Sequence, residues 1–181
     1  MRILTAGLDP AIAGLIVAGM ALLFAGAAFH KLRDLRRFEE IFAAYALLPA
    51  GSARLIPVLE SCIAAGLLLP ATRPAAAGGG ILLLLTYGGA IAINLRRGRR
   101  ELACGCGGPD DRRVIAGWMV WRNLSLAVLL ATVLLPWIAR PLGLTDAVTI
   151  GFGAASSALV YLCIDGLLGR NTRLAAAAQL S

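Results

Sequence analysis

Long apolar segments separated by short polar loops make up most of this chain, and five of them approach the length that crosses a lipid bilayer. They cover Pro10–Phe29, Leu55–Leu69, Ala75–Leu95, Val114–Trp137 and Ala147–Leu168. The second segment is short and ends before Pro70, so a span of about 20 residues must begin near Gly51 and include Glu60. The pattern predicts five transmembrane helices.

The segment Asp34–Leu48 has the periodicity of an amphipathic helix. Its large apolar residues recur at steps of three and four, and charged residues occupy the other faces. These apolar positions are Leu35, Phe38, Ile41, Phe42 and Tyr45. Pro49 and Gly51 then turn the chain back toward the bilayer. We therefore expect a helix that lies along the membrane interface between the first two spans.

The composition agrees with a membrane protein. Of the 181 residues, 59% are hydrophobic and 15% are charged, and the mean hydropathy is +0.81, whereas soluble domains carry about a quarter charged residues. The apolar run Pro10–Phe29 exceeds the apolar region of a signal peptide, about 7–15 residues, so we expect it to remain as a span. The predicted fold is all-α, a polytopic membrane helical bundle in a single domain over 1–181. Its four-helix core covers about 10–137, and a fifth helix and tail cover 138–181.

The net charge of +7 does not point to nucleic acid, because most basic residues lie in loops beside apolar spans and no aromatic residues alternate with them. Positive residues next to transmembrane helices instead indicate the cytoplasmic side. They concentrate between the first and second spans and between the third and fourth. This bias predicts an external amino terminus and a cytoplasmic loop between the third and fourth spans.

That loop contains Cys104 and Cys106, separated by Gly105. Arginines flank the pair, and we expect Arg99 and Arg112 to favour the thiolate, the nucleophilic form of cysteine. Two thiols one residue apart can close a small disulfide ring, and a strained, exposed disulfide is labile and oxidising. Transfer of a disulfide to or from a partner is the chemistry that this arrangement favours.

Two other readings of the cysteine pair remain open. Two thiolates supply half of a tetrahedral metal site, and the pair could also have no chemical role. The remaining cysteines, Cys62 and Cys163, lie inside apolar spans and do not form a second cluster. Further metal ligands would have to come from His30, a partner or another copy of the chain, so we assign no residue as a metal ligand.

Several polar residues should lie near the cysteine loop, because two spans end and two begin on its side of the membrane. They are His30, Glu60, Asn94, Arg122 and Asn123. Ionisable side chains inside a bilayer are costly, so we expect Glu60 and Arg122 to form an ion pair. This pair either holds two spans together or lines a pocket that handles protons or thiolates.

The other polar residues also allow two readings each. His30, the only histidine, is either an interfacial residue at a helix end or a proton acceptor. Asn94 and Asn123 either form hydrogen bonds between helices or orient a polar substrate, for which a quinone carbonyl is a candidate. The predicted catalytic residues are Cys104, Cys106, His30, Glu60 and Arg122.

Short motifs along the chain resemble the MauE family of methylamine-utilisation membrane proteins, which is related to the DoxX-like group. The motifs are FHKLRD at Phe29–Asp34, YALLP at Tyr45–Pro49, PVLE at Pro57–Glu60, AIAINLRRGRR at Ala90–Arg100, CGCGG at Cys104–Gly108 and WRN at Trp121–Asn123. The resemblance covers about 24–135, and the six motifs in this order are fairly specific.

The resemblance implies a role in maturing an exported, disulfide-rich enzyme subunit, as for methylamine dehydrogenase, with Cys104 and Cys106 as the redox pair. The expected partners are a thioredoxin-like protein and the client subunit, in a bacterial inner membrane. By chemical analogy with other membrane thiol oxidases, a quinone is a candidate electron acceptor. The rival reading is a non-catalytic membrane scaffold or chaperone that does not need the cysteines.

Overall fold

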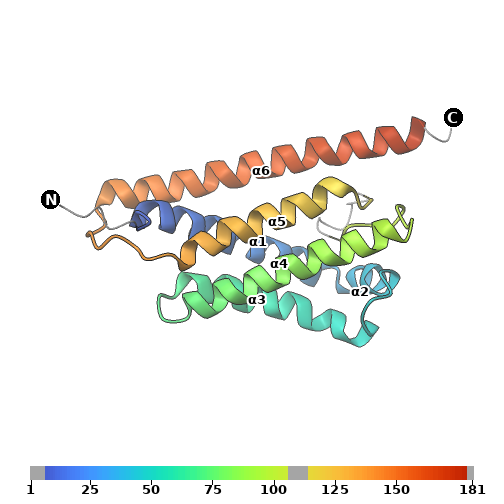
Figure 1. Ribbon diagram of the computed structural model, residues 1–181, viewed down its shortest axis with the longest axis horizontal. Helices are drawn as coiled ribbons and strands as arrows, with labels where there is room; N and C mark the ends of the chain where they lie inside the picture. Colours follow the sequence, from blue (N-terminus) through green and yellow to red (C-terminus); the bar gives the residue numbers. More distant parts are fainter. Residues whose placement is uncertain (1–6, 106–113, 179–181) are drawn as a thin grey trace.

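Helices form most of the structure in the computed structural model, which describes residues 7–105 and 114–178. The α-helices are α1 (Pro10–Arg33), α2 (Leu35–Ala44), α3 (Leu55–Leu68), α4 (Arg73–Arg96), α5 (Gly117–Ala131) and α6 (Leu144–Ala178). Two short 3-10 helices, η1 (Ala50–Arg54) and η2 (Thr132–Leu134), precede α3 and follow α5. The long helices run along the bundle, and the short α2 lies at one end of it (Figure 1).

Within the described residues, five helical segments are long and apolar enough to cross a membrane, which agrees with the predicted number of spans. They are Pro10–Arg33, Gly51–Leu68, Arg73–Arg96, Gly117–Leu134 and Leu144–Ile164. The second span begins at Gly51, as its short apolar run required, because η1 continues into α3. The chain is thus a multi-pass, all-α membrane bundle.

Local sequence signals set the ends of the first two helices. The Asp9 carboxylate accepts a hydrogen bond of 2.8 Å from the Ala11 amide, and Pro10 occupies the first turn of α1, where its missing N–H is not needed. Asp34 interrupts the helix and caps α2, accepting a bond of 3.2 Å from the Arg37 amide. The chain therefore turns after α1 and starts a separate amphipathic helix.

The core lies among α1, α3, α4 and α5, and the helices approach closely at Gly80 of α4. A Cβ atom at Gly80 would lie 2.7 Å from Leu130 Cδ2 and 3.1 Å from Phe24 Cε2. Phe24 and Leu130 are both fully buried. Since lipid tails are as apolar as these side chains, close packing rather than escape from water holds the helices together.

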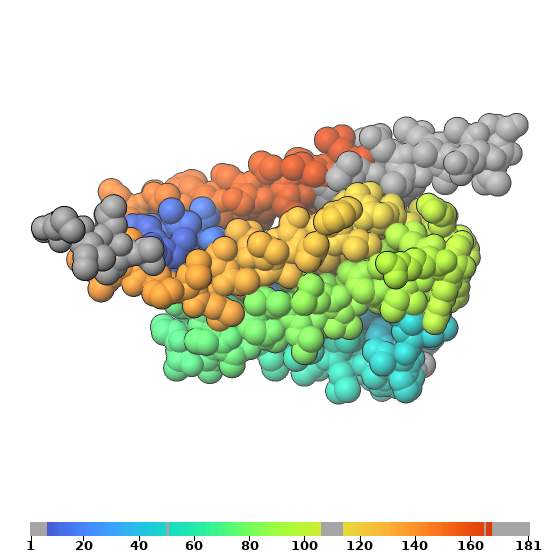
Figure 2. Space-filling model, in the orientation of Figure 1, coloured from blue at the N-terminus to red at the C-terminus, as the bar shows by residue number. Residues whose placement is uncertain are grey.

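The last helix, α6, lies along the edge of the bundle and packs against α1 (Figures 1 and 2). A Cβ atom at Gly14 of α1 would lie 2.7 Å from Ile150 Cδ1, and one at Gly153 of α6 would lie 2.9 Å from Leu15 Cδ1. Most described side chains of α6 are exposed, as expected for a helix that borders lipid. The fifth span is therefore an addition to the four-helix core.

Arg140 ties the beginning of α6 to the beginning of α1. Its guanidinium donates two hydrogen bonds of 2.9 Å to Asp9 and bonds of 2.8 and 2.9 Å to Asp146. These bonds lower the pKa of Asp9 below its usual 3.8 and raise the pKa of Arg140. Because the pKa of Asp9 is lowered on folding, its contribution is complete above pH 3.8 and is lost as the pH falls through the lowered value.

Replacing Arg140 by glutamine should loosen the amino end of α6 without unfolding the bundle, because exposed ion pairs contribute little to global stability. We expect faster proteolytic cleavage in the loop before α6 and a nearly unchanged melting temperature in detergent. Arg97→Gln, an exposed arginine at the end of α4, is the matched control. Equal cleavage rates for the two variants would show that Arg140 does not hold α6.

Candidate functional site

Polar side chains are buried at the end of the bundle where α1 and α4 end and α3 and α5 begin. The buried ones are Lys31, Glu60, Asn94 and Asn123, with exposed fractions of 7%, 0%, 0% and 3%. They come from four different helices. Ionisable and polar groups are expensive in lipid and face the interior of a bundle. The structure thus places three of the predicted site residues inside the bundle, and their roles stay predictions.

Glu60 is held by a lysine and a tyrosine. Lys31 Nζ lies 2.6 Å from Glu60 Oε1, and the Tyr87 hydroxyl donates to the same oxygen at 2.7 Å. Lys31 Nζ also lies 5.4 Å from the ring centroids of Phe38 and Tyr87, where the electron-rich ring faces attract a cation. One carboxylate oxygen therefore satisfies a charged donor and a neutral donor that come from two other helices.

The expected ion pair between Glu60 and Arg122 is wrong. The reason is the order in which the helices pack: α3 lies against α1 and α4, whereas α5 packs mainly on α4. Lys31 in the last turn of α1 therefore reaches Glu60. The Arg122 guanidinium carbon lies 5.4 Å from the Trp118 ring of its own helix.

The second carboxylate oxygen of Glu60 has a different environment. Oε2 is buried and has no hydrogen-bond partner within the described residues. A buried carboxylate oxygen normally accepts at least one bond. Oε2 is thus a buried acceptor for a proton, a water or a polar group.

Lys31 and Tyr87 contact Glu60 but are not among the site residues predicted from the sequence. Lys31 directly follows His30 at the end of a span, where it is indistinguishable by sequence from the other basic residues between the first two spans. Tyr87 lies seven residues before Asn94, and residues two turns apart share one face of a helix. The position of the Tyr87 hydroxyl on the same helix face as Asn94 is the sequence feature that could have identified Tyr87 as a site residue.

The cysteine loop is closed at its base. The Ile115 amide donates to the Leu102 carbonyl at 2.9 Å, and Ala103 and Val114 form an antiparallel bridge. Cys104 is half-buried and disulfide-bonded. Cys106, the other predicted member of the pair, lies outside the described residues.

Helix α2 packs over this loop. Gly105 has φ +69°, and a Cβ atom there would lie 3.1 Å from Ile41 Cγ2. The Tyr45 hydroxyl makes a long hydrogen bond of 3.5 Å to the Cys104 carbonyl. Burial raises the pKa of Tyr45 to about 12, and the positive charge of Arg122 opposes this rise. Tyr45 is therefore a neutral hydrogen-bond donor at physiological pH. The apolar face of α2 that carries Ile41 and Tyr45 covers the cysteine loop at this end of the bundle.

The two asparagines make structural contacts. Asn94 Nδ2 donates to the Tyr45 carbonyl at 3.3 Å and to the Ala90 carbonyl at 3.1 Å. Asn123 Nδ2 donates to the Met119 carbonyl of its own helix at 2.8 Å. Asn94 thus links α4 to the end of α2, as expected of a hydrogen bond between helices, whereas the Asn123 bond stays within its own helix.

His30 and Arg99 complete the predicted set. The His30 ring packs edge-on against Phe29 at 5.9 Å, and its buried Nδ1 has no partner within the described residues. Arg99 donates to the Ala44 carbonyl at 2.7 Å and to Asn94 Oδ1 at 3.2 Å. Arg99 thus holds backbone and amide oxygens, where we expected it beside a thiolate, and Arg112 lies outside the described residues.

Replacing Lys31 by methionine should destabilise the bundle by about 3–5 kcal/mol, because it leaves the Glu60 carboxylate buried without its cation. Adding Glu60→Gln to Lys31→Met should recover part of this loss. Tyr87→Phe should cost about 1.5–3 kcal/mol, the usual contribution of a hydrogen bond to a charged group. Denaturant unfolding in detergent measures all three.

Arg33→Met is the matched control, since Arg33 lies two residues beyond Lys31 and is exposed. We expect it to leave stability unchanged. If Lys31→Met were equally harmless, the ion pair would not support the bundle.

Comparison with known proteins agrees with this architecture. A family model described as methylamine utilisation protein MauE matches residues 9–138. The chain is 37% identical over 180 residues to the methylamine utilization protein MauE of Methylorubrum extorquens, covering 96% of this chain and 95% of the relative. It is 35% identical over 156 residues to the protein of that name from Paracoccus denitrificans, covering 83% of each. No solved structure matches the chain. The chain belongs to the MauE family.

Proposed function

We propose that this chain is a thiol–disulfide relay of the bacterial inner membrane that serves the maturation of an exported enzyme subunit in methylamine utilisation. The observation that carries the proposal is the disulfide at Cys104, in a loop that is closed at its base and packed under α2. The redox pair is Cys104 and Cys106. The names of the relatives supply the methylamine context.

The exchange reaction balances without a metal. A thiolate of a thioredoxin-like partner attacks one sulfur of the disulfide, forms a mixed disulfide and releases the other sulfur as a thiolate. The second thiol of the partner, once deprotonated, then attacks the mixed disulfide. The partner leaves oxidised, and Cys104 and Cys106 are left reduced with two electrons. Return of the pair to the disulfide requires an acceptor of those electrons, for which a quinone is our candidate.

Reoxidation of a dithiol also releases two protons, which need acceptors. Glu60 Oε2 and His30 Nδ1 are buried atoms without hydrogen-bond partners within the described residues, so each can take up a proton. Lys31 balances the charge of Glu60 in the resting state.

A non-catalytic scaffold is the second candidate function. It is favoured by the Asn94 bond to the Tyr45 carbonyl and by the Lys31–Glu60 ion pair, which both join different helical segments. A scaffold would keep its function when both loop cysteines are replaced.

Cys104→Ser and Cys106→Ser should each abolish oxidation of a thioredoxin-like partner by membranes that contain the chain, because the exchange needs both sulfurs. Gel-shift assay of the partner thiols measures this. The control is a Cys62→Ser, Cys163→Ser variant, whose changed residues are exposed free cysteines on α3 and α6. Partner oxidation that persists in both loop variants would favour the scaffold.

Maleimide should label Cys104 only after reduction, since Cys104 is disulfide-bonded. The Cys62→Ser, Cys163→Ser background removes the other reactive thiols. Comparing permeant and impermeant maleimides in intact cells then reports the side of the loop, which the positive charges predict to be cytoplasmic. Full labelling without reduction would contradict a resting disulfide.

A further inference from the structure

We propose that Tyr45, Asn94 and Arg99 form a clamp that fixes the cysteine loop against the end of α2 and thereby stabilises the Cys104 disulfide relative to the dithiol. The three are positioning residues, since the contacts they make run to backbone and amide groups. The inference rests on the proposed function only in taking the Cys104 disulfide as the reactive group.

Arg99 joins the ends of two helices. Its Nη2 donates to the Ala44 carbonyl at 2.7 Å, at the carboxyl end of α2, and its Nη1 donates to Asn94 Oδ1 at 3.2 Å, in the last turn of α4. The last carbonyls of a helix have no partner within the helix and carry the negative end of its dipole. The guanidinium therefore connects a terminal carbonyl of α2 with a side chain in the last turn of α4.

Asn94 completes the connection from the inside. Its Nδ2 donates to the Tyr45 carbonyl at 3.3 Å, directly after the residue that Arg99 holds. Asn94 is fully buried, so water does not compete for these bonds. The backbone of Ala44 and Tyr45 is thus held by two side chains that both come from the α4 end of the cysteine loop.

The clamp reaches Cys104 through the side chains of α2. The Tyr45 hydroxyl contacts the Cys104 carbonyl, and Ile41 leaves no space beside Gly105. Arg99 precedes Cys104 by only five residues, so the loop is fixed both where it leaves α4 and at the cysteine itself.

The same face of α2 also touches the buried ion pair. Phe38 lies three residues before Ile41 and seven before Tyr45, and its ring centroid is 5.4 Å from Lys31 Nζ. Residues at these spacings share one helix face. Helix α2 thereby connects the ion pair of α1 and α3 to the cysteine loop.

A fixed loop favours the disulfide for an entropic reason. Reduction of a disulfide releases the chain between its sulfurs, and the gain in freedom favours the dithiol. Contacts that hold the loop in place restrict the reduced form and limit this gain. Removing them should therefore make the disulfide easier to reduce.

The test is the equilibrium of Cys104 with dithiothreitol buffers, measured on the full chain in detergent by maleimide gel shift, in the Cys62→Ser, Cys163→Ser background. Arg99→Gln should shift the equilibrium toward the dithiol by at most about tenfold, the size expected if its hydrogen bonds to a charged group formed only in the disulfide form. Tyr45→Phe should shift it about two- to fivefold, because it removes one long, neutral bond.

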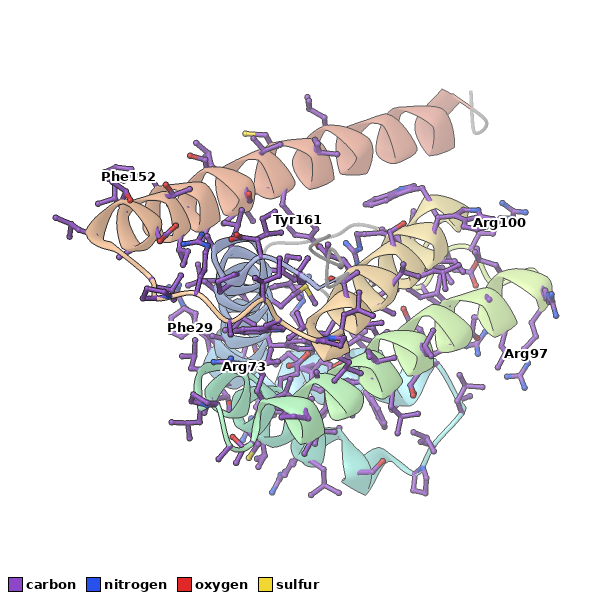
Figure 3. The ribbon with its side chains drawn as sticks, turned by 60° about the vertical axis from the view of Figure 1, so that its left-hand side comes forward. Phe29, Arg73, Arg97, Arg100, Phe152 and Tyr161 are labelled. Atoms are coloured by element: carbon purple, nitrogen blue, oxygen red, sulfur yellow. The ribbon has the colours of Figure 1, made fainter. Side chains whose placement is uncertain are left out.

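Arg97→Gln is the matched control for Arg99→Gln. Arg97 is exposed, and its side chain points away from the bundle (Figure 3). We expect the dithiol–disulfide equilibrium of Arg97→Gln to equal that of the parent chain. Melting temperature checks that each variant is folded, and Tyr45→Phe decides the question if Arg99→Gln does not fold.

Two failures are distinguishable. A parent disulfide that exchanges, with the same equilibrium in Tyr45→Phe, Arg99→Gln and Arg97→Gln, would overturn the clamp and leave the relay standing. A parent disulfide that no dithiol reduces would contradict the relay and the clamp together.

Discussion

A lysine and a glutamate 2.6 Å apart among apolar helices impose strict conditions on their surroundings. Each charge alone would be expensive in the interior, and the attraction offsets that expense only if the geometry is held. The end of α1 and the beginning of α3 must therefore stay together. Tyr87 of α4 supplies a further donor, and Phe38 of α2 covers the ammonium group with its ring. Four helices are thus tied to one pair of charges.

The position of the cysteine loop follows from this closure. Asp34 ends α1 and starts α2, so α2 is obliged to turn across the end of the bundle beside Lys31. With Phe38 over the lysine, Ile41 and Tyr45 on the same helix face come to lie over Gly105 and Cys104. An amphipathic helix that we expected at the membrane interface therefore places its apolar face on the protein. The site owes its shape to one helix that contacts both the ion pair and the loop.

Span number, the separate α2 and the cysteine loop could be predicted because they depend on patterns local to the sequence. Even the start of the second span at Gly51 followed from the length that a bilayer requires. The partner of Glu60 could not be read in this way. The positions of the spans in the sequence do not say which helices are neighbours. Lys31 and Arg122 both lie toward the same side of the membrane as Glu60, so either could have been its partner. Helix adjacency, a tertiary property, selected Lys31.

The contacts of Arg99 likewise could not be predicted from its residue type. An arginine near cysteines suggests thiolate stabilisation, but a guanidinium with five donors also satisfies helix carbonyls. Arg99 instead reaches the Ala44 carbonyl at the end of α2 and the Asn94 side chain in the last turn of α4. The role of Arg99 therefore depended on a contact between segments that are 55 residues apart.

The structure also bears on the meaning of the positive charges. Lys31, Arg54 and Arg99 each pair with another group of the protein, so they reflect tertiary contacts as well as topology. On the opposite side, Arg73 and Arg140 are engaged in the same way. The exposed basic residues that remain in the described part of the cysteine end include Arg33, Arg36, Arg96, Arg97 and Arg100. The cysteine end therefore still carries the excess of positive charge when the paired basic residues are left out. A cytoplasmic cysteine loop cannot touch an exported client directly, so a relay in that orientation requires a second component to carry electrons across the membrane.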